Sequence, residues 1–190
     1  MSVPYKHYFI ALDLPAQVVS ELVRAGTYVQ DTGLVRGRFV PQDKLHSTLK
    51  FLGNVTAEQL QEVKKRLALI KQPLFTLMLN GLSVFTDHEH IRIVYAHVES
   101  QQLSSLVAQL QTLFADLVAP DNRPFVGHIT LARVDKVKHP YRFMAALQNY
   151  TSALNTFNVT ELVLKGSEQT SQGIVYHDLA HYPLAPSDCK

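Results

Sequence analysis

One sequence pattern, His-x-Thr-Leu, occurs once in each half of this chain and constrains the fold more than any other feature. The first copy is His46-Ser47-Thr48-Leu49 and the second is His128-Ile129-Thr130-Leu131. Because successive side chains of a β-strand alternate between its two faces, the His and Thr of each copy point one way and the Leu points the other. If the halves are related by duplication, their two strands can lie side by side and gather four polar side chains around one substrate. The repeat therefore predicts a site with two catalytic histidines.

The same order of elements surrounds each copy. Hydrophobic periodicity and capping signals predict, in the first half, a strand at 8–12, a helix that starts at 13–15 and ends near 31–33, and a loop with Gly37 and Pro41. They then predict the motif strand at 45–52, a helix capped by Thr56 with Gln59, and a strand at 74–85. In the second half they predict a strand at 91–98, a helix capped by Ser100, the motif strand at 125–134, a helix at 141–150, and strands near 157–164 and 174–182. On the first motif strand, Leu45, Leu49 and Phe51 are expected opposite His46 and Thr48. Residues 86–90 read as a hairpin turn. We expect one two-lobed domain over 1–190, with an approximate repeat of 5–85 and 90–182.

Composition indicates an ordinary globular protein. The 190 residues are 46% hydrophobic, enough for a good-sized core, and no apolar run approaches the roughly 20 residues that cross a bilayer. The N-terminal residues lack a secretory layout, so we expect a cytoplasmic protein that does not bind membranes. Cys189 is the only cysteine, which excludes an internal disulfide and makes thiol chemistry an unattractive hypothesis.

Positive charge is concentrated near the motifs. The net charge of +2 is too small for a protein that coats nucleic acid. Nine of the 18 Lys and Arg residues nevertheless fall in two short windows: Arg36, Arg38, Lys44 and Lys50, then Arg123, Arg133, Lys136, Lys138 and Arg142. Together they indicate an anionic ligand.

Two histidines in one cleft suit acid and base catalysis. An unperturbed histidine has a pKa near 6.5, so one ring can be neutral while the other is protonated. The neutral ring takes a proton from the attacking group and the other gives one to the departing oxygen. Thr48 and Thr130 can donate hydrogen bonds to an anion between them. Arg133 could add a charged contact if a bulge, or the end of the strand, brings it to the face of His128. This chemistry favours metal-free transfer at a phosphate ester.

The motifs resemble those of a known superfamily. Residues 39–53, FVPQDKLHSTLKFLG, and residues 128–133, HITLAR, are similar to the paired signatures of the two-histidine (2H) phosphoesterases. Within that superfamily the chain resembles, over essentially its whole length, the bacterial and archaeal RNA 2′,3′-cyclic phosphodiesterases, also called 2′-5′ RNA ligases. It departs from their pattern at Gly127, where members often carry Pro.

The resemblance implies a fold, a reaction and roles for residues. The fold would be α+β and bilobed with pseudo-twofold symmetry, with two antiparallel sheets flanking a central cleft and helices outside. The reaction would be hydrolysis of a terminal 2′,3′-cyclic phosphate to a 2′-phosphomonoester, with neither metal nor cofactor. By the family pattern, His46 is the proton donor and His128 the proton acceptor. Thr48, Thr130 and Arg133 would hold the phosphate, and Phe39 or Phe51 could border the base.

The expected partner is RNA with a 2′,3′-cyclic phosphate end, such as a tRNA fragment, or a small cyclic-phosphate nucleotide; we expect a monomer. Three alternatives stay open. The protein could join RNA ends as a 2′-5′ ligase, since the reverse reaction uses the same acid and base. It could bind RNA ends or nucleotides without turnover, although binding alone does not need two titratable rings. The run His88-Glu89-His90, with His97 nearby, could instead ligate a metal, but turn histidines are commonly only solvated.

Overall fold

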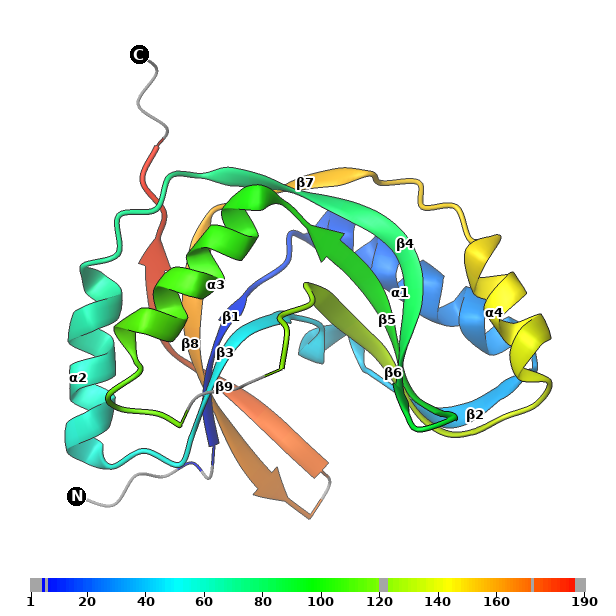
Figure 1. Cartoon of the computed structure of the whole chain (residues 1–190), viewed down its shortest axis with the longest axis horizontal. Helices are drawn as coiled ribbons and strands as arrows, with labels where there is room; N and C mark the ends of the chain where they lie inside the picture. Colours follow the sequence, from blue (N-terminus) through cyan, green and yellow to red (C-terminus); the bar gives the residue numbers. More distant parts are fainter. Residues whose placement is uncertain (1–4, 6, 120–122, 172, 187–190) are drawn as a thin grey trace.

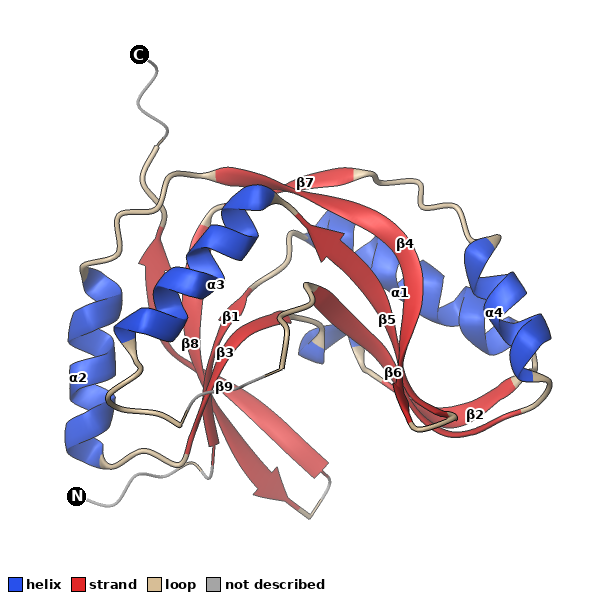
Figure 2. Cartoon of the chain, viewed as in Figure 1, coloured by secondary structure: helices blue, strands red, loops and turns tan. Residues whose placement is uncertain are grey.

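A computed structural model describes residues 5, 7–119, 123–171 and 173–186, and its elements form two antiparallel sheets with helices on their outer sides (Figures 1 and 2). Cys189 lies outside these residues. The first sheet has the strand order β3-β1-β8-β9, formed by β1 (His7–Leu12), β3 (Ser47–Gly53), β8 (Glu161–Thr170) and β9 (Gly173–Pro183). The second has the order β2-β6-β5-β4-β7, formed by β2 (Val35–Phe39), β4 (Phe75–Asp87), β5 (His90–Glu99), β6 (His128–Val137) and β7 (Thr156–Val159). The helices are α1 (Ala16–Asp31), α2 (Ala57–Ala68), α3 (Gln101–Leu113) and α4 (Pro140–Gln148), with a 3-10 turn at Gln42–Lys44. The predicted α+β class with two antiparallel sheets is confirmed.

Each of the two sheets contains strands from both halves of the chain. In the first sheet β1 pairs with β8 and so joins β1 and β3 to β8 and β9 from the C-terminal end; in the second, β6 pairs with β2 and β5 with β4 from the N-terminal half. Helices follow the same rule, because α1 contacts β6 and β2 whereas α3 contacts β3 (Figure 1). Each sheet therefore contains strands from both halves of the sequence. The repeat boundaries of 5–85 and 90–182 remain a prediction.

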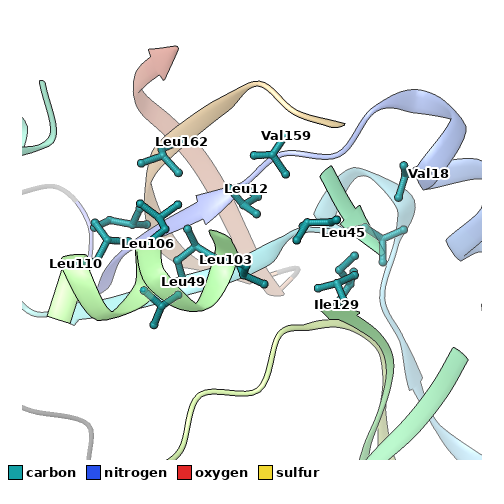
Figure 3. Close-up of a cluster of buried hydrophobic side chains, with 14 of the residues drawn as sticks. Leu12, Val18, Leu45, Leu49, Leu103, Leu106, Leu110, Ile129, Val159 and Leu162 are labelled. Atoms are coloured by element: carbon teal, nitrogen blue, oxygen red, sulfur yellow. The ribbon is translucent and has the colours of Figure 1, made fainter. Parts of the chain in front are cut away.

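A continuous hydrophobic core holds these elements together. Leu103, Leu106 and Leu110 of α3 are buried in one cluster with Leu49 of β3 and Ile129 of β6 (Figure 3). The Leu of the first tetrapeptide and the Ile of the second thus point into the core, as alternation requires. Burying them fixes the opposite face of each motif strand for the polar residues.

Two helix caps predicted from the sequence are present. Gln59 N–H donates to the Thr56 hydroxyl at 3.2 Å and the Gln59 side chain accepts from Thr56 N–H at 2.8 Å, so α2 begins with a capping box. Leu103 N–H donates to the Ser100 hydroxyl at 3.0 Å and starts α3. The hairpin turn between β4 and β5 is also confirmed, with His88 in a left-handed conformation at φ 52°.

Two element predictions were wrong. The segment around Gly37 was expected to be a loop but forms β2, an edge strand beside β6. A Cβ at Gly37 would collide with the carbonyl oxygen of Arg133, so only glycine fits this close strand contact. The single strand expected at 157–164 is two strands, β7 and β8, which belong to different sheets.

Among the described residues, none of the helices combines the length and the apolar character that crossing a membrane requires.

Candidate active site

The two motifs meet where the sheets adjoin. His46 immediately precedes β3 and His128 is the first residue of β6. Strands β3 and β6 are in contact although they belong to different sheets (Figure 1). His128 lies close enough for its charge to lower the pKa of His46. The expectation that duplication places both histidines in one site therefore agrees with the geometry.

Both imidazole rings are oriented by the same backbone contact. Nδ1 of His46 lies 2.8 Å from the carbonyl oxygen of Lys44, and Nδ1 of His128 lies 2.8 Å from that of Val126. A carbonyl oxygen only accepts hydrogen bonds, so Nδ1 carries the hydrogen in each ring. The Nε2 atom of each ring is therefore left to take up or release a proton.

Aromatic side chains hold each ring in place. The ring centroid of His46 lies 5.1 Å from that of Phe9 and 5.0 Å from that of Tyr176. The ring of His128 meets Phe85 at 5.0 Å and Tyr95 at 5.6 Å, both edge to face. Phe85 and Tyr95 also stack on each other at 4.2 Å. Rings fixed by packing stay in the orientation that proton transfer needs.

Burial lowers the pKa of both histidines. For His46 the largest cause is desolvation, which the bond to the Lys44 carbonyl opposes; the positive charges of Lys165 and His128 lower the pKa further and Asp13 raises it. For His128 desolvation likewise outweighs the bond to the Val126 carbonyl. Each ring is therefore neutral to a lower pH than a free histidine, which suits a base.

An ion cluster stands beside His46. Lys165 of β8 is 7% exposed, and its Nζ lies 2.7 Å from Asp13 and 2.6 Å from Asp178. The three side chains line, together with His46, a pocket of about 570 Å³. The opposite charges of the cluster partly offset each other at His46, where Lys165 lowers the pKa more than Asp13 raises it.

The threonines face the site with free hydroxyls. Thr48 pairs with Ala11 of β1, and Thr130 pairs with Tyr95 of β5, whose ring packs on His128. Within the described part of the chain, neither hydroxyl group has a hydrogen-bond partner. Both can donate to the oxygens of a bound anion without adding charge.

A β-bulge brings Arg133 to the same face as His128 and Thr130. On β5, Val94 pairs with Ala132 but the next residue, Tyr95, pairs with Thr130, so Leu131 is an extra residue in β6. Leu131 and Ala132 are consequently both buried, and the exposed face resumes at Arg133. Of the two ways in which Arg133 was expected to reach the site, a bulge or the end of the strand, the structure contains the bulge.

The two aromatic candidates lie in different places. Phe39 pairs with Ala132 and packs with the cluster of buried side chains under α1, on the core side of the second sheet. Phe51 is 60% exposed, and its ring lies 6.2 Å from that of Phe9. The expectation that Phe51 faces away from the site was wrong, because a bulge in β3 at Leu49 changes its face. Phe51 therefore stays a candidate for contact with a base, and Phe39 is a packing residue.

The structure explains why residue 127 is a glycine. Its carbonyl oxygen accepts from Val98 N–H at 3.0 Å, and a Cβ at this position would collide with the carbonyl oxygen of Val98. The backbone just before His128 is thus pinned against β5, which is possible because glycine has no side chain.

The run His88-Glu89-His90 lies in the exposed turn between β4 and β5. His97 instead lies across from His128 in the register of β5 and β6. In the ranges that the structure describes, no group of three or more His, Cys, Asp or Glu side chains is arranged to hold a metal ion.

Sequence reasoning missed the residues that support the histidines. Phe9, Tyr176, Phe85 and Tyr95 are far from the motifs along the chain, and the ion pairs of Lys165 join three separate segments. The available signal was weak: a Lys in the middle of a strongly apolar strand, where an unpaired charge would be unfavourable.

The two motif strands bring together two histidines whose Nε2 atoms are free. A threonine lies two residues after each histidine. This arrangement defines a phosphoesterase of the two-histidine class. A family model described as LigT like Phosphoesterase matches residues 12–95 and 97–176. The chain belongs to this family of LigT-like phosphoesterases, which confirms the resemblance drawn from the motifs.

Several relatives are similar over much or nearly all of the chain. An RNA 2′,3′-cyclic phosphodiesterase of Methanothermobacter thermautotrophicus is 29% identical over 185 residues, which are 93% of this chain and 97% of the relative. A protein of the same name from Escherichia coli K12 is 34% identical over 140 residues, 70% of this chain and 74% of the relative. Among solved structures, E. coli LigT complexed with 3′-AMP superposes with a TM-score of 0.75 at 26% identity, covering 95% of this chain and 98% of the other.

Proposed function

We propose that this protein is an RNA 2′,3′-cyclic phosphodiesterase, which hydrolyses a terminal 2′,3′-cyclic phosphate to a 2′-phosphomonoester. The observation that carries the proposal is the pair of histidines on adjoining strands, each with Nδ1 bound to a carbonyl and Nε2 free. The names of the similar proteins support the substrate class, since relatives from archaea and bacteria are called RNA 2′,3′-cyclic phosphodiesterases.

In this mechanism His128 is the base and His46 the acid. Nε2 of His128 takes a proton from water as the water oxygen forms a bond to phosphorus. The bond from phosphorus to the ribose 3′ oxygen breaks, and Nε2 of protonated His46 gives its proton to that oxygen. Each transfer contributes about 10²–10⁴-fold to the rate. The lowered pKa of His128 suits a base, and the lowered pKa of His46 makes its protonated form a stronger acid toward the departing oxygen.

Thr48, Thr130 and Arg133 would bind the phosphate. Negative charge grows on the non-bridging oxygens as water attacks, and donors already in place stabilise that charge without rearrangement. Arg133 is exposed on the face shared with Thr130, and its guanidinium can contact two oxygens at once.

The direct test is incubation of the protein with a 2′,3′-cyclic-phosphate dinucleotide in EDTA, with separation of 2′- from 3′-phosphate products. We expect a 2′-phosphate product at a rate that EDTA does not change, because the mechanism routes both protons through histidines. A product that forms only with added divalent metal, or a 3′-phosphate, would contradict the proposal. Binding without product would favour an RNA-end binding module, and a joined 2′-5′ product with a 5′-hydroxyl strand would favour the ligase.

The pH dependence follows from the pKa shifts. Burial lowers the pKa of both His46 and His128 below 6.5, so the state with one proton on the pair is most populated at acidic pH. We expect kcat/KM for a cyclic mononucleotide to be bell-shaped with its maximum below about pH 6.5. Rates measured from pH 4 to 9 at constant ionic strength test this; a flat profile would exclude two titrating histidines.

RNA as the partner is part of this proposal. The monomeric state and the cytoplasmic location expected from the sequence remain predictions.

A further inference from the structure

We propose that four cations of β2 and β6 form a binding track for the backbone of an RNA strand whose 3′ end occupies the active site. These residues, called the basic strip below, are Arg36, Arg38, Arg133 and Lys136. The inference rests on the proposed function and adds that the natural substrate is an oligonucleotide rather than a small cyclic nucleotide.

The register of the two strands gathers the cations on one face. Arg36 lies across from Lys136, and Arg38 lies across from Arg133. Residues directly opposite in an antiparallel pair point to the same side, with Cβ atoms about 4.5–5.5 Å apart. All four are exposed, whereas Val134, on the other face, is buried. The strip is thus two like-charged pairs in succession along the edge of the second sheet.

This arrangement is unfavourable unless an anion binds there. Like charges directly opposite across two strands repel each other and destabilise the sheet. Among the described residues, none of the four cations forms an ion pair; Asp135, also exposed, is the only carboxylate on the two strands. The four cations and the one carboxylate together carry a net charge of +3, which exceeds the net charge of +2 of the whole chain. The excess positive charge is therefore local.

The strip is continuous with the site. Through the bulge at Leu131, Arg133 shares the face of His128 and Thr130, so the strip begins at the group proposed to bind the cyclic phosphate. It continues along β6 to Lys136, about 10 Å further on at 3.3 Å per residue. A row of cations that leads away from a terminal phosphate site matches the charge of further phosphates on the same strand. Such contacts bind the backbone without reading its sequence.

The test compares substrates of different length. We would measure kcat/KM for a cyclic mononucleotide and for a single-stranded RNA of ten nucleotides with a 2′,3′-cyclic end, using wild-type protein and the variant Arg36→Gln/Arg38→Gln/Lys136→Gln. Arg133 is kept because it belongs to the proposed phosphate site. We expect kcat/KM for the oligonucleotide to fall about 10-fold or more in the variant, and that for the mononucleotide to stay within about twofold. The slope of log kcat/KM against log salt should fall by about 2, since single-strand binding loses roughly 0.7 per phosphate contact.

A matched control removes equal charge elsewhere. Lys64→Gln/Lys65→Gln/Lys71→Gln takes three cations from α2 and the segment after it, on the lobe of the first sheet. This control variant should have the wild-type kcat/KM for both substrates and the wild-type salt slope. The track would be contradicted if the strip variant lost kcat/KM equally for the oligonucleotide and the mononucleotide. It would also be contradicted if the wild-type kcat/KM did not depend on substrate length. Because the two substrates are measured separately, absence of hydrolysis of both by the wild-type protein would overturn the proposed function instead.

Removing the strip should also relieve repulsion. We expect the melting temperature of the strip variant at low salt to equal or exceed that of wild type, because opposed like charges are lost. A lower melting temperature would mean that these cations stabilise the fold, and would contradict the proposal that they serve a ligand.

Discussion

Replacing His128 with Ala should lower kcat for a 2′,3′-cyclic-phosphate dinucleotide by about 10²–10⁴-fold, and His46→Ala should do the same. Each substitution removes the single Nε2 that accepts or supplies a proton in the transition state. Thr48, Thr130 and Arg133 remain, so KM should change little, and loss of kcat without loss of binding is the signature of an interaction made in the transition state. Steady-state kinetics, with binding of a non-hydrolysable nucleotide phosphate measured by calorimetry, check both expectations.

A second substrate separates the two roles. Nitrophenolate departs without a proton, so a nitrophenyl phosphodiester needs the base but not the acid. On this substrate His46→Ala should lose much less activity than His128→Ala, whereas on the cyclic phosphate both should be severely impaired. His88→Ala, which changes an exposed histidine of the β4–β5 turn, serves as the control and should match wild type. Retained activity in both active-site variants would exclude the two-histidine mechanism.

The pair of histidines could be predicted from the sequence because it depends only on local features. A tetrapeptide that sits on a strand in each half fixes which residues enter the core, and Leu49 and Ile129 are both buried as alternation requires. Helix caps at Thr56 and Ser100 are also local, since each bond joins residues three apart. Such short-range signals can be recognised in the sequence without knowledge of the tertiary structure.

Bulges explain the largest error in placing a side chain. Strict alternation puts Phe51 opposite His46, but the extra residue Leu49 in β3 turns Phe51 to the side of Phe9. The same device in β6 moves Arg133 to the face of His128. The sequence indicated that Arg133 needed a bulge or the end of the strand, but it contains no signal for a bulge at Leu49, because a bulge is set by pairing with the neighbouring strand.

Local sequence patterns also could not predict that each sheet contains strands from both halves of the chain. β8 pairs with β1 although their paired residues are more than 150 positions apart, and β2 pairs with β6 across more than 90 positions. Periodicity identifies a strand but not its partner, so it predicted the order of elements and not the composition of each sheet. The supports of the active site, Tyr176 and Lys165, lie on these long-range strands and were missed for that reason.

Glu21 of α1 should be the most sensitive position for stability outside the core. It is 6% exposed and accepts bonds from Arg24 at 2.7 Å, Tyr150 at 2.7 Å, Ser152 at 2.8 Å and Ala153 N–H at 3.2 Å. These bonds fasten α1 to the segment between α4 and β7. Glu21→Ala leaves several donors without a partner, so we expect it to lower the free energy of unfolding by about 2–4 kcal/mol. Urea denaturation measures this directly, and Glu62→Ala, which removes an exposed i,i+4 pair with Arg66, should cost at most about 0.5 kcal/mol.

The contribution of Glu21 should depend on pH in a defined direction. Burial alone would raise the pKa of Glu21, but the bonds from Arg24, Tyr150, Ser152 and Ala153 outweigh it and lower the pKa from 4.5 to about 2. A carboxyl whose pKa is lower in the folded state stabilises the fold above its unfolded pKa, and loses that effect as pH falls toward the folded value. The difference in stability between wild type and Glu21→Gln should therefore be constant above about pH 5 and shrink between about pH 4.5 and 2. A difference that does not change over this range would show that Glu21 acts through packing and neutral hydrogen bonds rather than through its charge.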